Sequence, residues 1–397
     1  MVTLRKVTEI KEHPNADALE LALIDGWQCC VKKGEFIQDE LVVFFEIDSL
    51  LPVTEEFEFL RKSSYVRKEW LEGIMPNAEG FRLRSIKLRK ELSQGLVTKL
   101  PDALKGQILH LANLQASNPN LADEIHAEVF NKDYSEYFGV IKYDPPQRMN
   151  GQGGGIPGGN FPHFIPKTDQ ERIQNIPTSY LQQCIDDEEL FEVTQKYHGS
   201  SITVFYLRED SPYIDEKTPA GLGICSRNIN LKIEENPDNH FVKTALEKNL
   251  HIVVQKLSEE LNIDIAIQGE LCGPGINQNW HGLEEHNIFI FDIYNITERR
   301  YFLPDERLRI LKRIWYDFGY LGTSVVNLYY PEDNKLTEGF LMKLPSTDRG
   351  ELLKLAEYKL PNGKPNEGLV FKSAARDFSF KAVSNEFLLN GGEESES

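Results

Sequence analysis

A glycine- and proline-rich run, DPPQRMNGQGGGIPGGNFP over residues 144–162, divides the chain into two unequal parts. Glycine resists ordering and proline lacks an amide N–H, so such a run supports neither a helix nor a central strand. A phosphate-binding loop would need a lysine followed by serine or threonine and then a helix, and neither follows here. We therefore predict a flexible linker over 141–163, between a first domain over 1–140 and a second over 164–390.

The first part has the pattern of a small β-domain. Short stretches of strand-forming residues alternate with turns, among them HPNAD over 13–17. This spacing, with an insertion over 53–78, favours a small Greek-key β-barrel of the oligonucleotide-binding (OB) type, closed by a helix over 121–138. A purely structural β-domain with a basic face is the alternative. The expected strands cover 3–10, 19–24, 27–31, 40–47, 80–89 and 95–100.

Charge is unevenly distributed along the chain. The net charge of −18 argues against indiscriminate nucleic-acid binding. Residues 61–106 nevertheless hold eleven Lys and Arg against five Asp and Glu, and Arg82, Arg84 and Lys87 lie on one expected strand. We expect this strand to contact nucleic acid. The acidic tail GGEESES, over 391–397, is predicted to be disordered.

The second part alternates strands and helices without the regular period of a doubly wound sheet, which favours the α+β class. We expect helices over 241–261, 304–319 and 350–358, and another that a Thr168–Glu171 capping box opens and that carries Arg172. Strands are expected over 221–233, 264–276, 287–295, 365–373 and 377–389. No run approaches the ~20 apolar residues of a membrane span, so no membrane partner is expected.

The stretch FEVTQKYHGSSITVF, over 191–205, reads as strand, tight turn and strand, with Lys196 and Gly199 at the turn. A lysine fixed by a sheet beside a glycine can be a nucleophile. Its ordinary pKa of about 10.4 must then fall by roughly 3 units, which requires a metal ion or other cations nearby. An ordinary exposed turn lysine is the alternative on these residues alone.

Later strands supply groups that would suit such a nucleophile. Glu270 and Glu367 lie at strand positions, where a buried carboxylate is costly unless it is paired or coordinates an ion. Each also has a structural interpretation as a surface acid, and Phe291 as a core residue. Together they could hold a ribose hydroxyl, a hydrated Mg²⁺ and a purine ring, while nearby cations bind phosphate. The strand-borne cations are Arg227, Lys372 and Lys381.

These segments resemble, in order, the motifs of the covalent nucleotidyltransferases, which include ATP-dependent polynucleotide ligases and mRNA capping enzymes. The matching segments are KYHG (196–199), SR (226–227), GE (269–270), FD (291–292), EGLVFK (367–372) and SFK (379–381). KYHGSS, SRN and GELCGPGI are most similar to RNA ligases that seal nicks in duplex RNA, whereas DNA ligases usually carry Asp at the site of His198. HPNAD, GFRLRSIKLR, SQGL and FIPKTDQERIQN resemble the Deinococcus and Naegleria type, in which an OB domain precedes the ligase domain.

The resemblance implies a fold and a three-step reaction. The second domain would have ATP-grasp-like antiparallel sheets with flanking helices. Lys196 would take AMP from ATP, pass it to an RNA 5′-phosphate, and a 3′-hydroxyl would then expel it. Lys196, Glu367 and Lys381 would be catalytic, with Glu367 holding Mg²⁺ or Mn²⁺ through waters. The residues expected to bind ATP are Gln195, His198, Gly199, Arg227, Glu270, Phe291, Lys372 and Arg172.

One position departs from the family pattern. Many relatives carry two lysines spaced by one residue in the last motif, whereas Val383 stands where the second would follow Lys381. Either Lys372 covers the missing charge or the RNA is held differently.

The expected partner is nicked double-stranded RNA or an RNA/DNA hybrid, bound by a monomer. A GTP-dependent capping-type guanylyltransferase is the first alternative, disfavoured because only a short tail follows Lys381. A non-catalytic RNA-binding relative is the second. Five cysteines without CxxC spacing indicate free thiols in a reducing intracellular compartment, the cytoplasm or nucleus.

Overall fold

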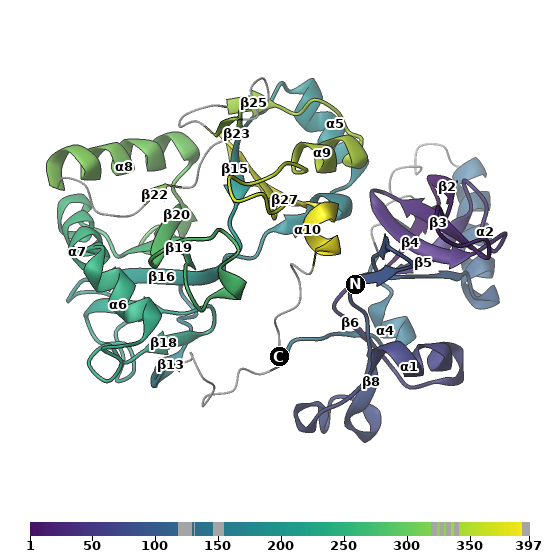
Figure 1. Cartoon of the computed structure of the whole chain (residues 1–397), viewed down its shortest axis with the longest axis horizontal. Coiled ribbons are helices and arrows are strands. Elements are labelled where there is room, and N and C mark those ends of the chain that lie inside the picture. The colour runs from purple at the N-terminus through teal and green to yellow at the C-terminus, as the bar shows by residue number, and fades with distance from the viewer. Residues whose placement is uncertain are drawn as a thin grey trace. The chain divides into compact units, whose positions relative to one another are not determined.

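The computed structural model describes residues 1–117, 129–130, 132–145, 155–318, 324–325, 329–330, 335–336 and 341–390. The chain divides into two units, Met1–Pro146 and Gln147–Ser397 (Figure 1). The predicted linker contains two paired strands: β12 (Ile141–Lys142) belongs to a sheet of the first unit and β13 (Pro157–Asn160) to a sheet of the second. The tail 391–397 and half of the predicted helix 121–138, residues 121–128 and 131, lie outside the described residues.

The N-terminal unit is built from short antiparallel ladders. Its described strands form the sheets β1-β5-β11, β2-β3-β4, β12-β6-β8-β7 and β10-β9, rather than one closed ring. The strands are β1 (Val2–Lys6), β2 (Glu9–Glu12), β3 (Leu19–Ile24), β4 (Trp27–Lys32), β5 (Leu41–Phe45), β6 (Ser49–Leu51), β7 (Tyr65–Arg67), β8 (Glu79–Arg82), β9 (Ile86–Leu88), β10 (Glu91–Ser93) and β11 (Leu96–Lys99). Its helices are α1 (Arg61–Ser64), α2 (Asp102–Ser117) and α4 (Ser135–Phe138).

Strand β5 is central to this unit because both of its faces are buried. Side chains alternate across a strand. Val43 and Phe45 accordingly pack into one core with Phe81 and Phe138, while Phe44 on the other face packs into a second core around Trp27. Because both faces are buried, the LVVFF run of β5 is apolar throughout and does not alternate with polar residues.

Among the described residues, the C-terminal unit has two main sheets and a two-stranded ladder of β23 (Tyr329–Tyr330) and β24 (Lys335–Leu336). The larger has the order β13-β18-β17-β16-β19-β20-β21, with β22 beside β20, and the smaller has the order β14-β27-β26-β15-β25. The remaining strands are β14 (Glu171–Arg172), β15 (Leu190–Lys196), β16 (Ser200–Leu207), β17 (Gly221–Cys225), β18 (Ile229–Leu231), β19 (Ile265–Cys272), β20 (Asn287–Asn295), β21 (Arg300–Tyr301), β22 (Ser324–Val325), β25 (Leu341–Lys343), β26 (Gly368–Ser373) and β27 (Ser379–Val383).

Each sheet of this unit carries its own helices (Figure 1). Helices α6 (His240–Glu247) and α7 (Leu250–Leu261) pack against the larger sheet through residues such as Val242 and Val254. Helices α5 (Thr178–Asp186) and α9 (Arg349–Leu355) pack against the smaller sheet through Leu181 and Leu352. The other helices are α8 (Pro304–Phe318) and α10 (Asn385–Leu389). In the described part of the chain, none of the helices is both long and apolar enough to cross a membrane.

Several of the expected elements were wrong, and the expected strands 3–10 and 221–233 are each two strands. No helix follows Thr168, whose hydroxyl contacts that of Ser201, and Arg172 lies on β14. The helix over 241–261 is two helices, because Asn249 adopts a left-handed conformation with φ of 59°. The strand over 377–389 ends at Val383, where Ser384 caps helix α10 by accepting a hydrogen bond from the Phe387 amide.

The expected strand 80–89 is also two strands, and they belong to different sheets. Strand β8 pairs with β6 and β7, whereas β9, among the strands that the structure describes, pairs with β10 alone. Helix α2 was not anticipated from the sequence.

Candidate active site

Lys196 lies where the chain passes from one sheet of the C-terminal unit to the other. It ends β15, which pairs with β26 in the smaller sheet, and four residues later β16 begins in the larger sheet beside β19. The strand–turn–strand prediction is confirmed, but the two strands do not pair as a hairpin. Groups from both sheets can therefore converge on the turn.

Gly199 permits this crossing. A Cβ on Gly199 would lie 2.3 Å from the Leu271 carbonyl oxygen and 2.6 Å from Cys272 Sγ, so a side chain would push β19 away. The Gly199 amide donates to Glu270 Oε1 at 3.1 Å, and Asn277 donates to its carbonyl. The glycine thus brings the carboxylate of Glu270 next to the Lys196 turn.

Glu367 binds the Lys196 amine directly. Lys196 Nζ lies 2.7 Å from Glu367 Oε1, and His198 Nδ1 lies 3.7 Å from the same oxygen. Burial by itself would raise the pKa of Glu367, but Lys196 and His198 outweigh burial and lower it. Two of the three expected catalytic residues therefore form an ion pair at the junction of the sheets.

The protonation of Lys196 differs from the expectation. Burial and the cation Arg172 lower the pKa of the amine, but Glu367 and Glu270 outweigh them and raise it above its ordinary value. Of the two expected means of lowering this pKa, a metal ion or nearby cations, the cations of the chain do not suffice. A cation that binds the carboxylates is needed to change the balance.

Lys381 is the lysine of this site whose pKa falls. Its strand β27 pairs with β14 so that Lys381 lies next to Arg172. Burial, followed by the charges of Arg172 and Lys196, lowers the pKa of Lys381 to about 8. Arg172 and Lys381 therefore form a positively charged edge beside Lys196.

Glu270 and Arg227 lie on the larger sheet. Burial raises the pKa of Glu270 to about 7; the charge of Glu367 adds to this rise, while Lys196 and Arg227 oppose it. Arg227 is not within a strand as expected but in the turn between β17 and β18. Its side chain is 57% exposed and lies 3.2 Å from Asp169, so it can reach a ligand.

Phe291 occupies a β-bulge of β20. The register shifts there, because Gln268 faces Asp292 and Gly269 faces Ile290, which leaves Phe291 without an opposite residue. Bulges redirect a side chain relative to its sheet. The half-buried ring is contacted by the ammonium of Lys372, 5.3 Å from its centroid. Gln195, which precedes Lys196 on β15, is buried.

The structure does not bring Lys372 to Lys196. Lys372 pairs across the sheet with Glu192, four residues or about 13 Å along β15 from the nucleophile. Its ammonium is 2.6 Å from Asp292 Oδ2 and 2.8 Å from the Phe291 carbonyl oxygen. Because it is committed to these partners, it does not replace the second lysine that the last motif lacks.

Four residues near the site were missed from the sequence. His281 accepts a hydrogen bond from the His198 amide at its Nε2, and burial lowers its pKa to about 4, so it is neutral at pH 7. Asn277 donates a hydrogen bond to the Gly199 carbonyl, and Asp169 pairs with Arg227, as described above. Arg307 on α8 contacts both Glu192 and Asp292. Two of the four, Asn277 and His281, lie in the polar, glycine-flanked segment INQNWHG over 276–282. This segment is the sequence feature that could have indicated a site.

The residues present fit a divalent cation at Glu367. Its Oε2 atom is buried and has no hydrogen-bond partner among the described residues. No group of three or more His, Cys, Asp or Glu that could hold a metal occurs in the described part of the chain. Mg²⁺ does not need one, because it commonly binds one or two carboxylates together with waters and substrate phosphates.

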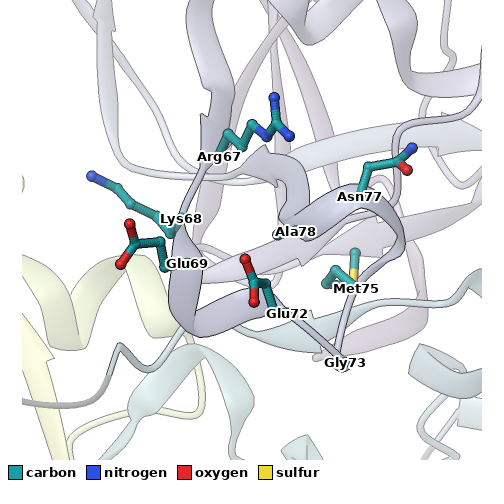
Figure 2. Close-up of a pocket in the computed structure, with 8 residues that line it drawn as sticks. All are labelled: Arg67, Lys68, Glu69, Glu72, Gly73, Met75, Asn77 and Ala78. Atoms are coloured by element: carbon teal, nitrogen blue, oxygen red, sulfur yellow. The ribbon is translucent and has the colours of Figure 1, made fainter.

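A pocket of about 560 Å³ lies elsewhere, in the N-terminal unit (Figure 2). It lies along the irregular segment between β7 and β8, and both acidic and basic side chains line it. None of the predicted site residues contributes to it. Its lining residues are Arg67, Lys68, Glu69, Glu72, Gly73, Met75, Asn77 and Ala78.

Comparison with known proteins identifies both parts of the chain. A model of the RNA ligase family matches residues 189–383, and a model of an OB-fold domain matches residues 1–100. A variant of Naegleria gruberi RNA ligase, solved with ATP and Mn, is 31% identical, with 98% of each chain covered and a TM-score of 0.70. The chain belongs to the RNA ligase family. No curated protein matches it.

Two further structures of the Naegleria gruberi RNA ligase agree. The enzyme solved with PPi is 32% identical, with 98% of each chain covered and a TM-score of 0.69. A variant with AMP and Mn is 31% identical at the same coverage, with a TM-score of 0.70. The predicted resemblance to ligases of the Naegleria type, the order of an OB-fold domain before a ligase domain, and the prediction of an enzyme that joins RNA are confirmed.

Proposed function

We propose that this RNA ligase uses ATP and a divalent cation, Mg²⁺ or Mn²⁺, to form a lysyl-AMP on Lys196. The observation that supports this most strongly is the meeting of Lys196, Glu367, Glu270 and Lys381 at the junction of two sheets. The Naegleria gruberi ligase, solved with ATP and Mn, supports the choice of nucleotide and metal.

In this proposal each group has one task. The Lys196 amine forms a bond to the α-phosphorus of ATP while the bond to pyrophosphate breaks. Lys381 and Arg172 bind phosphate at the positive edge, and Glu270 and Arg227 bind the ribose and phosphate. His198 orients Glu367, and Gln195 and Gly199 shape the turn. When bound at Glu367, a divalent cation would lower the pKa of the neighbouring amine and neutralise phosphate charge.

The adenine would stack on Phe291, the ring that the bulge of β20 redirects. Lys372 would then act through its contact with this ring rather than by replacing the lysine that is missing at Val383. Its partner Asp292 keeps it at that position.

We propose that the RNA substrate is a 3′-OH/5′-phosphate nick in duplex RNA or an RNA/DNA hybrid, held by the OB-fold unit and sealed by a monomer. The motif KYHGSS, which resembles nick-sealing ligases, supports this choice. We also propose a reducing intracellular compartment, because all five cysteines are free and none forms a disulfide.

Labelling with radioactive nucleotide tests the proposal. The protein is incubated with Mg²⁺ or Mn²⁺ and α-labelled ATP or GTP, and the covalent product is resolved on a denaturing gel. We expect label from ATP and none in Lys196→Ala. Label from GTP alone would favour the capping-type alternative, and no label would favour a non-catalytic RNA-binding protein.

A further inference from the structure

The sequence predicted one basic strand over 80–89. In the structure, the exposed cations of this region lie on or beside the hairpin of β9 and β10 in the N-terminal unit. Arg82 on β8 is not free: it lies 3.3 Å from Asp48, and its guanidinium packs over the ring of Tyr143 at 4.1 Å. Four other cations on or beside the hairpin are exposed, and none forms an ion pair among the described residues. They are Arg84, Lys87, Arg89 and Lys90.

The hairpin is held firmly on one side and open on the other. On β10, Leu92 is buried, its carbonyl accepts from Gln28 at 2.8 Å, and Ser93 Oγ accepts from the Cys30 amide at 3.0 Å. All three residues of β9 are exposed, including Ile86 at 45% and Leu88 at 36%. A rigid base thus presents an outer strand of alternating cationic and apolar side chains.

The two residues of the hairpin turn adopt a backbone conformation that is unfavourable for their side chains. Arg89 and Lys90 form a two-residue connection in which both have positive φ, 50° and 77°. Such turns favour Asn-Gly, because residues with a bulky side chain are strained there. Strained positions occur disproportionately where a side chain has a functional task. The two long cations therefore extend from the tip at some cost in stability.

We propose that the β9–β10 hairpin binds the phosphate backbone of the RNA substrate, with Arg89 and Lys90 as the principal contacts. The proposal rests on the proposed function, which requires an RNA duplex beside the nick. Charge complementarity supports it, since a chain with net charge −18 places four unpaired cations beside the single carboxylate Glu91 here. Exposed Ile86 and Leu88 would contact the sugars between successive phosphates.

The competing explanation is that these cations only prevent association of an exposed edge strand. The double variant Arg89→Asn/Lys90→Gly separates the two explanations, because Asn-Gly suits the turn and should leave the melting temperature equal or higher. In the full-length protein we expect lysyl-AMP formation from ATP at the wild-type rate. The KM for nicked duplex RNA should rise on the order of tenfold near physiological salt, with kcat little changed, and the slope of log K against log salt should shrink by about 2.

Two controls accompany this variant. Lys32→Gln/Lys33→Gln removes the same charge from another exposed position of the unit and should cost less, and Arg89→Lys/Lys90→Arg keeps the charge and should bind as wild type. Unchanged RNA binding by the Asn-Gly variant, with or without self-association, would overturn the proposal. A failure of the wild-type protein to seal RNA at all would instead count against the proposed function.

Discussion

At the residue scale, the structure changes the account of how Lys196 becomes reactive. The sequence predicted the nucleophile and its acidic neighbours, but not which charges dominate, because that depends on distances set by the two sheets. Glu367 and Glu270 prevail over Arg172 and raise the pKa of the amine. The pair with Glu367 therefore favours the protonated amine, and the same carboxylate is the one proposed to hold the metal.

This balance predicts the effect of Glu367→Gln on the amine itself. Removing the charge of Glu367 removes the largest contribution that raises the pKa of Lys196, so this pKa should fall in the metal-free protein. Site-resolved acetylation by mass spectrometry across a pH series measures it as the pH at which Lys196 is half reactive. Adding Mn²⁺ to the wild type should shift Lys196 in the same direction, and should have little effect on the variant.

Glu357→Gln is the control, because Glu357 is an exposed carboxylate of the same unit that is not among the groups shifting the pKa of Lys196. Its substitution should leave the Lys196 profile unchanged. An unaltered profile in Glu367→Gln would show that the ion pair does not set the protonation of the nucleophile. Nucleotidyl transfer by Glu367→Gln should nevertheless fall by on the order of 100-fold or more, because the carboxylate proposed to hold the metal is lost.

At the scale of elements, α8 links the two sheets of the C-terminal unit through Arg307. Its guanidinium is 5% exposed and contacts Glu192 on β15 and Asp292 on β20, 3.2 Å away. Lys372 on β26 pairs with the same Asp292. Two cations and two carboxylates thus connect strands that carry the nucleophile and the proposed adenine-stacking ring.

Arg307→Met should therefore destabilise the C-terminal unit by about 3–5 kcal/mol, since it leaves buried carboxylates with too few partners. Urea unfolding followed by circular dichroism measures the loss. Arg309→Met, on the same helix but 75% exposed, should change stability by less than about 0.5 kcal/mol. The double variant Glu192→Leu/Arg307→Met should recover part of the loss. Equal stabilities for Arg307→Met and Arg309→Met would contradict the role given to this network.

Elements that local sequence determines could be predicted, and elements that depend on distant parts of the chain could not. Strand alternation or helical periodicity predicts β15, β19, β20 and α8. The expected bounds of these elements lie close to their bounds in the structure. The pairing of β15 with β26 and of β16 with β19 could not be predicted, because these partners lie about 60 to 180 residues away along the chain. The break at Asn249 gives only a weak signal, since Asn adopts the left-handed conformation more readily than most residues but does not require it.

At the scale of the whole molecule, the chain separates into units with independent cores. The buried clusters around Phe45 and around Trp27 contain only residues of the N-terminal unit. Those around Val254 and Phe371 contain only residues of the C-terminal unit. Every predicted catalytic and nucleotide-binding residue lies in the second unit, whereas the hairpin proposed to bind RNA lies in the first.

A fragment that begins at residue 147 should therefore fold and form lysyl-AMP from ATP within about threefold of the full-length rate. Its sealing of nicked duplex RNA should fall by on the order of 100-fold, because the contacts that hold the duplex are absent and affinity depends strongly on phosphate contacts. Supplying the N-terminal unit separately at micromolar concentration should not restore sealing, since a covalent connection gives effective concentrations in the millimolar range. Full-length Lys196→Ala should be inactive in both assays. If the fragment sealed nicks as well as the full chain, the N-terminal unit would have no part in holding RNA, and the hairpin proposal would fail with it.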